Sequence, residues 1–142
     1  LGVGVTWKFT LNMDFLSRFA PIGPKPRKRD RLGVDVRVDV PEEWIHSGDF
    51  FGVFRPDGID PMLAWGMGST TGHTTVALRF PNGQGLHVCE SQAKSDYWPV
   101  NGVQCTPYRQ WVRQAAAAGY HVVWAHLSPE CRARFDAAQA VA

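Results

Sequence analysis

A histidine and a glutamate that could act together in acid–base chemistry stand at the outer ends of two neighbouring strand-like segments, as His73 and Glu90. Histidine is the side chain best suited to accept a proton near neutral pH. A carboxylate bonded to its other ring nitrogen fixes the tautomer and the orientation of the ring. The pair therefore predicts a general base with its orienting acid. The alternative interpretation is a structural histidine and a surface glutamate.

The elements that must position this pair form a predicted hairpin. His73–Phe80 and Leu86–Ser91 are apolar and partly β-branched, and the segment Pro81–Gly85 between them is rich in turn-forming residues. Asn82-Gly83 between two such segments is a strong signal for a two-residue hairpin turn. The sequence therefore predicts two antiparallel strands here.

The turn also predicts the register. With Asn82 and Gly83 at its centre, Phe80 faces Gly85 and Thr75 faces Glu90. Side chains alternate along a strand, so His73 and Glu90 fall on one face as diagonal neighbours, within hydrogen-bonding reach. A slip of one residue would put them on opposite faces, so the prediction depends on the turn type.

The rest of the chain after Pro41 predicts a small α+β domain, which we assign to residues 41–142. We expect an antiparallel sheet of four to five short strands with two or three helices packed against it. Helix starts are indicated where a capping residue precedes proline, as in Asp60-Pro61 and Ser128-Pro129. The further strands are predicted at Phe50–Phe54, Val103–Thr106 and Tyr120–Ala125, and the first and last of these are expected to be buried. Helices are predicted at Met62–Met67, Pro107–Ala118 and Cys131–Ala142.

Residues 1–40 predict an extended N-terminal arm. Pro21, Pro24 and Pro26 oppose a helix, and the valines of 34–40 alternate with charged residues as in a strand with one wet face. The basic run of 25–31 is typical of a solvated arm, or of one that docks on an acidic partner, RNA or anionic lipid. We expect the arm to contact a protein partner.

Several short motifs follow one another in the order found in a known family. The chain resembles the permuted papain-like (NlpC/P60-type) cysteine hydrolases over about the middle half of its length. The motifs are Ser47-Gly48-Asp49-Phe50-Phe51, Gly72-His73-Thr74-Thr75-Val76, Leu86-His87-Val88-Cys89-Glu90-Ser91, Gly102-Val103 and Thr106-Pro107 with Trp111.

This resemblance implies a papain-like α+β core with His73 as general base and Glu90 as its orienter. It also implies a nucleophilic cysteine on a helix C-terminal to all of these motifs, so we expect the domain to be incomplete at its C-terminus. Cys131, in the first turn of a predicted helix, is a weak nucleophile candidate. Cys89 and Cys105 are expected to be packed thiols, with one disulfide possible if the protein is secreted.

The loop before His73 predicts the wall of a cleft, lined by Ser69, Thr70 and Gly72. It resembles a phosphate-binding loop, but the spacing differs and His73 stands where lysine is required. Zinc is disfavoured because the five histidines lack ligand spacing, and we expect no metal and no cofactor. A net charge of +2 does not favour nucleic acid as a partner, and the longest apolar runs are too short for a membrane span.

Two functions remain open from the sequence. The first is a cysteine-type amidase, peptidase or acyl-transfer domain acting on a peptide or acyl substrate. The second is a catalytically inactive domain of the same fold that serves as a structural or binding subunit of a larger assembly. The cellular compartment is not indicated by the sequence.

Overall fold

The structure is a computed structural model that describes residues 40–55, 60–69, 71–81 and 83–142. The predicted N-terminal arm, with its basic run and alternating valines, lies outside the described residues except for Val40. Thr70 and Asn82 also lie outside them. Along the described part of the chain, no helix is long and apolar enough to cross a membrane.

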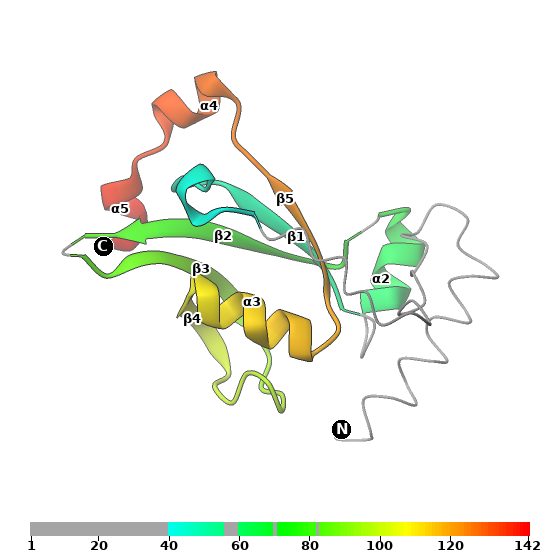
Figure 1. Cartoon of the computed structure of the whole chain (residues 1–142). Coiled ribbons are helices and arrows are strands. Elements are labelled where there is room, and N and C mark those ends of the chain that lie inside the picture. Colours follow the sequence, from blue (N-terminus) through cyan, green and yellow to red (C-terminus); the bar gives the residue numbers. More distant parts are fainter. Residues whose placement is uncertain (1–39, 56–59, 70, 82) are drawn as a thin grey trace.

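The centre of the fold is one antiparallel sheet in the order β4-β3-β2-β1-β5, as Figure 1 shows. Every neighbouring pair is antiparallel, strands β1 to β4 lie beside one another in chain order, and only the connection from β4 to β5 crosses the sheet. This confirms the predicted α+β class with a small antiparallel sheet. The strands are β1 (Phe50–Phe54), β2 (His73–Phe80), β3 (Gly85–Gln92), β4 (Gly102–Pro107) and β5 (His121–Ala125).

The helices lie around this sheet at distinct places. The longest, α3, packs along one face, whereas α2 lies at the end of the sheet where β1 ends and β2 begins (Figure 1). The C-terminal helices lie toward the opposite end. The helical elements are η1 (Glu42–Trp44), α2 (Asp60–Met67), α3 (Tyr108–Ala117), α4 (Pro129–Arg134) and α5 (Ala137–Val141).

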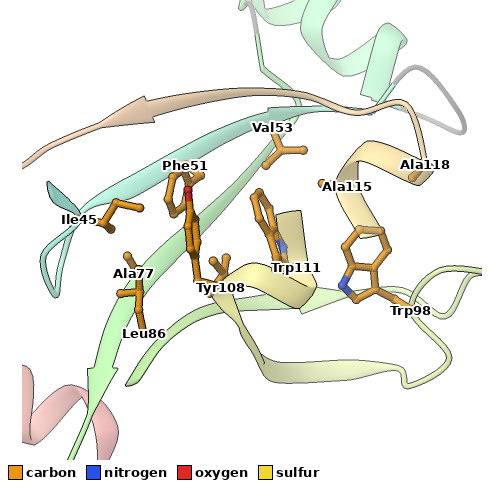
Figure 2. Close-up of a cluster of buried hydrophobic side chains, with 11 residues drawn as sticks. Ile45, Phe51, Val53, Ala77, Leu86, Trp98, Tyr108, Trp111, Ala115 and Ala118 are labelled. Carbon is orange, nitrogen blue, oxygen red and sulfur yellow. The ribbon is translucent and has the colours of Figure 1, made fainter. Parts of the chain in front are cut away.

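The hydrophobic core lies between α3 and the sheet (Figure 2). Trp111 is 1% exposed and stacks on Phe51 of β1, with ring centroids 5.4 Å apart. Trp98, from the loop before β4, is equally buried and stacks on Tyr120. Large aromatic rings contribute strongly to the stability of small cores, so the contact of Trp111 with Phe51 helps to fix α3 on its face of the sheet.

The hairpin register is the one that the turn predicts. Phe80 pairs with Gly85, and the ladder continues to the pair of Val76 with Cys89. Gly83 has φ of 75°, a left-handed conformation that glycine adopts without steric cost. These pairs have the parity that the prediction requires.

Two predicted elements differ from the structure. β5 is an edge strand with Val123 60% exposed, not a buried strand, because only β1 pairs with it among the described strands. The predicted continuous helix from Cys131 to Ala142 is two short helices. Phe135 is extended between them, where its ring lies against Gly48, and Asp136 caps α5 by accepting from the amide of Gln139.

Candidate functional site

His73 and Glu90 are joined by a hydrogen bond, as the predicted geometry requires. Nε2 of His73 lies 2.7 Å from Oε2 of Glu90. The other carboxylate oxygen accepts a hydrogen bond from the indole N–H of Trp111, also at 2.7 Å. The Glu90 side chain is 2% exposed and that of His73 is 13% exposed, so the acid is enclosed while the ring reaches the surface.

The hydrogen bond determines which ring nitrogen of His73 can take a proton. A carboxylate oxygen only accepts, so Nε2 carries the hydrogen and Nδ1 presents the lone pair of the neutral ring. Among the described residues, no group hydrogen-bonds Nδ1. The arrangement therefore holds a base whose Nδ1 is available to a reacting group.

A second buried polar cluster lies at the same end of the sheet. Asp60, 1% exposed at the start of α2, accepts hydrogen bonds from Nε and Nη2 of Arg55, each at 2.7 Å. Arg55 also donates from Nη1 to the side-chain oxygen of Gln92, which is 3% exposed. This chain of contacts links the segments after β1, at the start of α2 and at the end of β3.

The sheet register explains why the two clusters are neighbours. Val53 pairs with His73 across β1 and β2, and Arg55 follows two residues later on the same side of its strand. Gln92 ends β3 two residues after Glu90, which bonds His73 at the start of β2. Both clusters are thus built where β1 and β3 end and β2 begins.

The predicted cleft loop is organised largely by its own hydrogen bonds. The Ser69 hydroxyl donates to the carbonyl of Thr71 and accepts from its amide, at 2.8 and 3.1 Å. Gly72 packs so closely on Asp60 that an added Cβ would lie 2.8 Å from its side chain. Ser69 and Gly72 therefore shape the connection between α2 and β2, while Thr70 lies outside the described residues.

Cys131 is not brought to His73. It is exposed in the first turn of α4, where Ser128 caps its amide. Its neighbour Arg132 bonds Asp49, which precedes β1, whereas His73 pairs with Val53 near the other end of that strand. Four residues of extended strand span about 13 Å, so the thiol and the base lie at opposite ends of β1.

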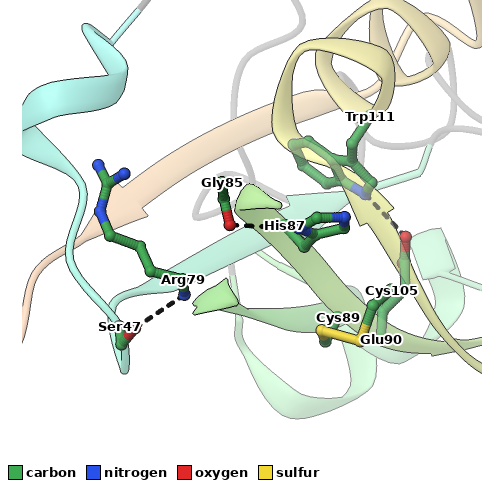
Figure 3. The surroundings of a disulfide bond; sticks show 8 residues. All are labelled: Ser47, Arg79, Gly85, His87, Cys89, Glu90, Cys105 and Trp111. Atoms are coloured by element: carbon green, nitrogen blue, oxygen red, sulfur yellow. Dashed lines mark hydrogen bonds between the residues drawn. A yellow bond between two sulfur atoms is a disulfide. The ribbon is translucent and has the colours of Figure 1, made fainter. Parts of the chain in front are cut away.

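The prediction that Cys89 and Cys105 are packed thiols is wrong, because they form a disulfide (Figure 3). The two residues pair directly across β3 and β4, so their side chains leave the sheet on the same face. That face is opposite to the one carrying Glu90, as strand alternation predicts. The sequence could not show the pairing because the long loop before β4 leaves the β3–β4 register undetermined.

Within the described residues, no group of three or more histidine, cysteine, aspartate or glutamate side chains is arranged to hold a metal ion. Comparison with known proteins leaves the family open: no protein-family model, no curated protein and no solved structure matches the chain. The function must therefore be argued from the site itself.

Sequence reasoning missed the residues around the His73–Glu90 pair. The sequence indicates Trp111 only as part of a motif, because its contact with Glu90 depends on how α3 packs on the sheet. The sequence predicts Asp60 as a helix cap, yet its carboxylate bonds the side chain and the amide of Arg55. Gln92 carried one usable signal: it lies two residues after Glu90, so the predicted hairpin puts it on the same face.

Proposed function

We propose that the protein is a cysteine-type amidase, peptidase or acyl-transfer domain of the permuted papain-like group, with His73 as general base and Glu90 as its orienting acid. The observation that carries this proposal is the hydrogen-bonded series from His73 to Glu90 to Trp111. A buried carboxylate held from both sides fixes the ring and favours the imidazolium that forms during catalysis. The five-stranded antiparallel sheet is compatible with this fold group.

In the proposed reaction, Nδ1 of His73 takes the proton of a thiol, and the thiolate attacks the carbonyl carbon of a peptide or acyl substrate. The carbonyl π electrons move to oxygen and give a tetrahedral intermediate. As the intermediate collapses, the bond to the leaving group breaks and the imidazolium returns the proton to that group. Water or another acceptor then releases the acyl group from sulfur, with His73 again accepting the proton.

The thiol in this proposal is none of the three cysteines of this sequence. Cys89 and Cys105 are bonded to each other, and Cys131 lies at the other end of β1 from His73. The resemblance implies that a helix C-terminal to the motifs carries the nucleophile. A cysteine near the start of a helix encoded beyond Ala142 would supply the expected nucleophile.

The same positions of the cysteines favour a second candidate, a non-catalytic domain of this fold that acts as a binding or structural subunit. In this case the His73–Glu90–Trp111 series serves to satisfy buried polar groups between α3 and the sheet. The partner would be a protein that contacts the N-terminal residues 1–40, a prediction that rests on their sequence alone.

The test is hydrolysis of 4-nitrophenyl acetate and of acyl 4-nitroanilides by the protein expressed from its complete reading frame. We expect His73→Asn to lower kcat/KM by about 100-fold to 10,000-fold, the range typical of a general base. His87→Asn is the matched control, because His87 lies on β3 three residues before Glu90 and alternation along the strand puts it on the opposite face. Equal rates for both variants, or no turnover by the unmodified protein, would rule out the enzyme and favour the non-catalytic candidate.

A further inference from the structure

Gln92 is a buried amide whose orientation is set by its neighbours. Its side-chain oxygen accepts from Nη1 of Arg55, and Arg55 is in turn held by two hydrogen bonds to buried Asp60. Because the oxygen faces Arg55, the NH2 group of the amide is directed away from it. Across the described part of the chain, no group accepts a hydrogen bond from this NH2 group.

The amide lies on the same face of the sheet as the candidate base. Gln92 is the last residue of β3 and His73 is the first residue of β2, so both lie at the same end of the sheet. Glu90, the hydrogen-bond partner of His73, precedes Gln92 by two residues, and alternation along β3 therefore puts Gln92 on the face that carries Glu90. An N–H donor and the base are thus on one face at the same end of the sheet.

We propose that Gln92 is a substrate-binding residue whose amide N–H hydrogen-bonds the carbonyl oxygen of the scissile bond, and that Arg55 and Asp60 are its positioning residues. The inference rests on the proposed function, since it requires a carbonyl substrate at His73. Negative charge develops on that oxygen in the tetrahedral intermediate, where a fixed donor stabilises it more than in the bound substrate.

The electrostatics of the cluster suit this role. The guanidinium of Arg55 polarises the amide through its oxygen and makes the N–H a stronger donor. Asp60 pairs with the same guanidinium at 2.7 Å and offsets its positive charge.

The alternative is that Arg55, Asp60 and Gln92 only hold α2 against the sheet. The variant Gln92→Glu separates this structural role from substrate binding. Glutamate has nearly the same shape and accepts from Arg55 at least as well, so a structural role survives the change. It offers no N–H to a substrate oxygen when ionised. Gln92→Met, which has similar volume and no donor, serves as a second variant, and Gln84→Glu on the exposed hairpin turn is the matched control.

The experiment measures kcat and KM for 4-nitrophenyl acetate with the complete protein, together with the thermal midpoint of each variant. We expect Gln92→Glu to keep the thermal midpoint and to lower kcat about 100-fold with little change in KM, as for loss of one oxyanion donor. The corresponding thionoester is the second substrate. Sulfur accepts hydrogen bonds weakly, so the preference for the oxygen ester should shrink in Gln92→Glu and Gln92→Met but not in Gln84→Glu.

The outcomes separate this inference from the proposed function. If His73→Asn is inactive while Gln92→Glu and Gln92→Met keep the wild-type kcat and the wild-type preference for the oxygen ester, the role of Gln92 is overturned and the base stands. If His73→Asn retains full activity, or the unmodified protein has none, the proposed function fails and this inference fails with it. Arg55→Lys should show an intermediate loss of kcat, because lysine keeps the charge but not the planar geometry.

Discussion

Replacement of Asp49 by asparagine should strongly destabilise the fold, although the two side chains have almost the same size. Asp49 is 0% exposed and its carboxylate accepts four hydrogen bonds. One oxygen accepts from the amide of Leu127 and from Arg132, and the other accepts from the amide of His46 and the indole of Trp124. Asp49 thereby fastens β5 and α4 to the start of β1.

The size of the expected loss in the free energy of unfolding follows from the fact that each carboxylate oxygen of Asp49 accepts two of the four hydrogen bonds. Whichever way the asparagine amide is turned, its NH2 group faces two of the four donors and leaves them unpaired. Each buried donor without a partner costs about 1–3 kcal/mol, so the expected loss is about 2–6 kcal/mol. That is a large part of the roughly 5–15 kcal/mol by which domains are usually stable.

The assay is urea unfolding followed by tryptophan fluorescence, with Asp96→Asn as control because Asp96 is exposed and should change the free energy of unfolding by less than about 0.5 kcal/mol. A loss for Asp49→Asn as small as that of the control would refute the proposed anchoring of the C-terminal segment.

The same carboxylate predicts an acid dependence. Burial raises the pKa of Asp49, but the backbone hydrogen bonds of His46 and Leu127, the Trp124 indole and the Arg132 charge outweigh burial and hold it below 3.8. The ionised form is thus favoured by folding, so its stabilisation is present above about pH 3.8 and is lost as the pH falls through the lower folded-state pKa. The difference in stability between the wild type and Asp49→Asn should therefore shrink in that acid range.

Three further predictions concern stability. Reduction of the disulfide, or its removal by Cys89→Ser with Cys105→Ser, should lower the free energy of unfolding by about 3 kcal/mol, the value typical of a loop near this size; an unchanged urea midpoint would contradict it. Trp111→Phe removes a buried donor to Glu90 and should cost about 1.5–3 kcal/mol in the same assay, and a loss under 0.5 kcal/mol would mean that this bond contributes little. Burial lowers the pKa of His121 below 6.5, so stability should fall as the pH drops below 6.5 toward the folded-state pKa; unfolding at pH 7.5 and 5.5 should show a smaller fall for His121→Gln.

How far the sequence predicts the fold depends on how local the determining contacts are. The register of β2 and β3 is correct because a two-residue turn fixes it within a few residues of Phe80 and Gly85. The nine-residue loop between β3 and β4 fixes no such parity, so the pairing of Cys89 with Cys105 could not be inferred. The exposure of β5 depends on sheet order, which the apolar residues of Val122–Ala125 do not specify.

The candidate site shows the same division between local and long-range contacts. The contact of His73 with Glu90 lies within one hairpin, and alternation along two strands was enough to predict it. The contact of Trp111 with Glu90 requires α3 to fold back over the sheet, and no local pattern specifies its depth or rotation. A carboxylate such as that of Asp60 can either cap its own helix or bind a distant guanidinium, and only the tertiary structure shows which.

The Gly48-Asp49 motif shows why a resemblance in sequence order needs the structure before a role is assigned. Its position before β1 resembles that of a motif in the proposed family, but Asp49 lies at the opposite end of that strand from the partner of His73. Its four donors come from the flanking loop and the C-terminal segment, so the motif holds the architecture together instead of contributing to the site. The polar groups at the other end of β1 are those of Arg55, Asp60 and Gln92, which none of the recognised motifs contains. The case for chemistry therefore rests on the buried Glu90 that bonds a partly exposed imidazole and on the buried polar groups at the same end of the sheet.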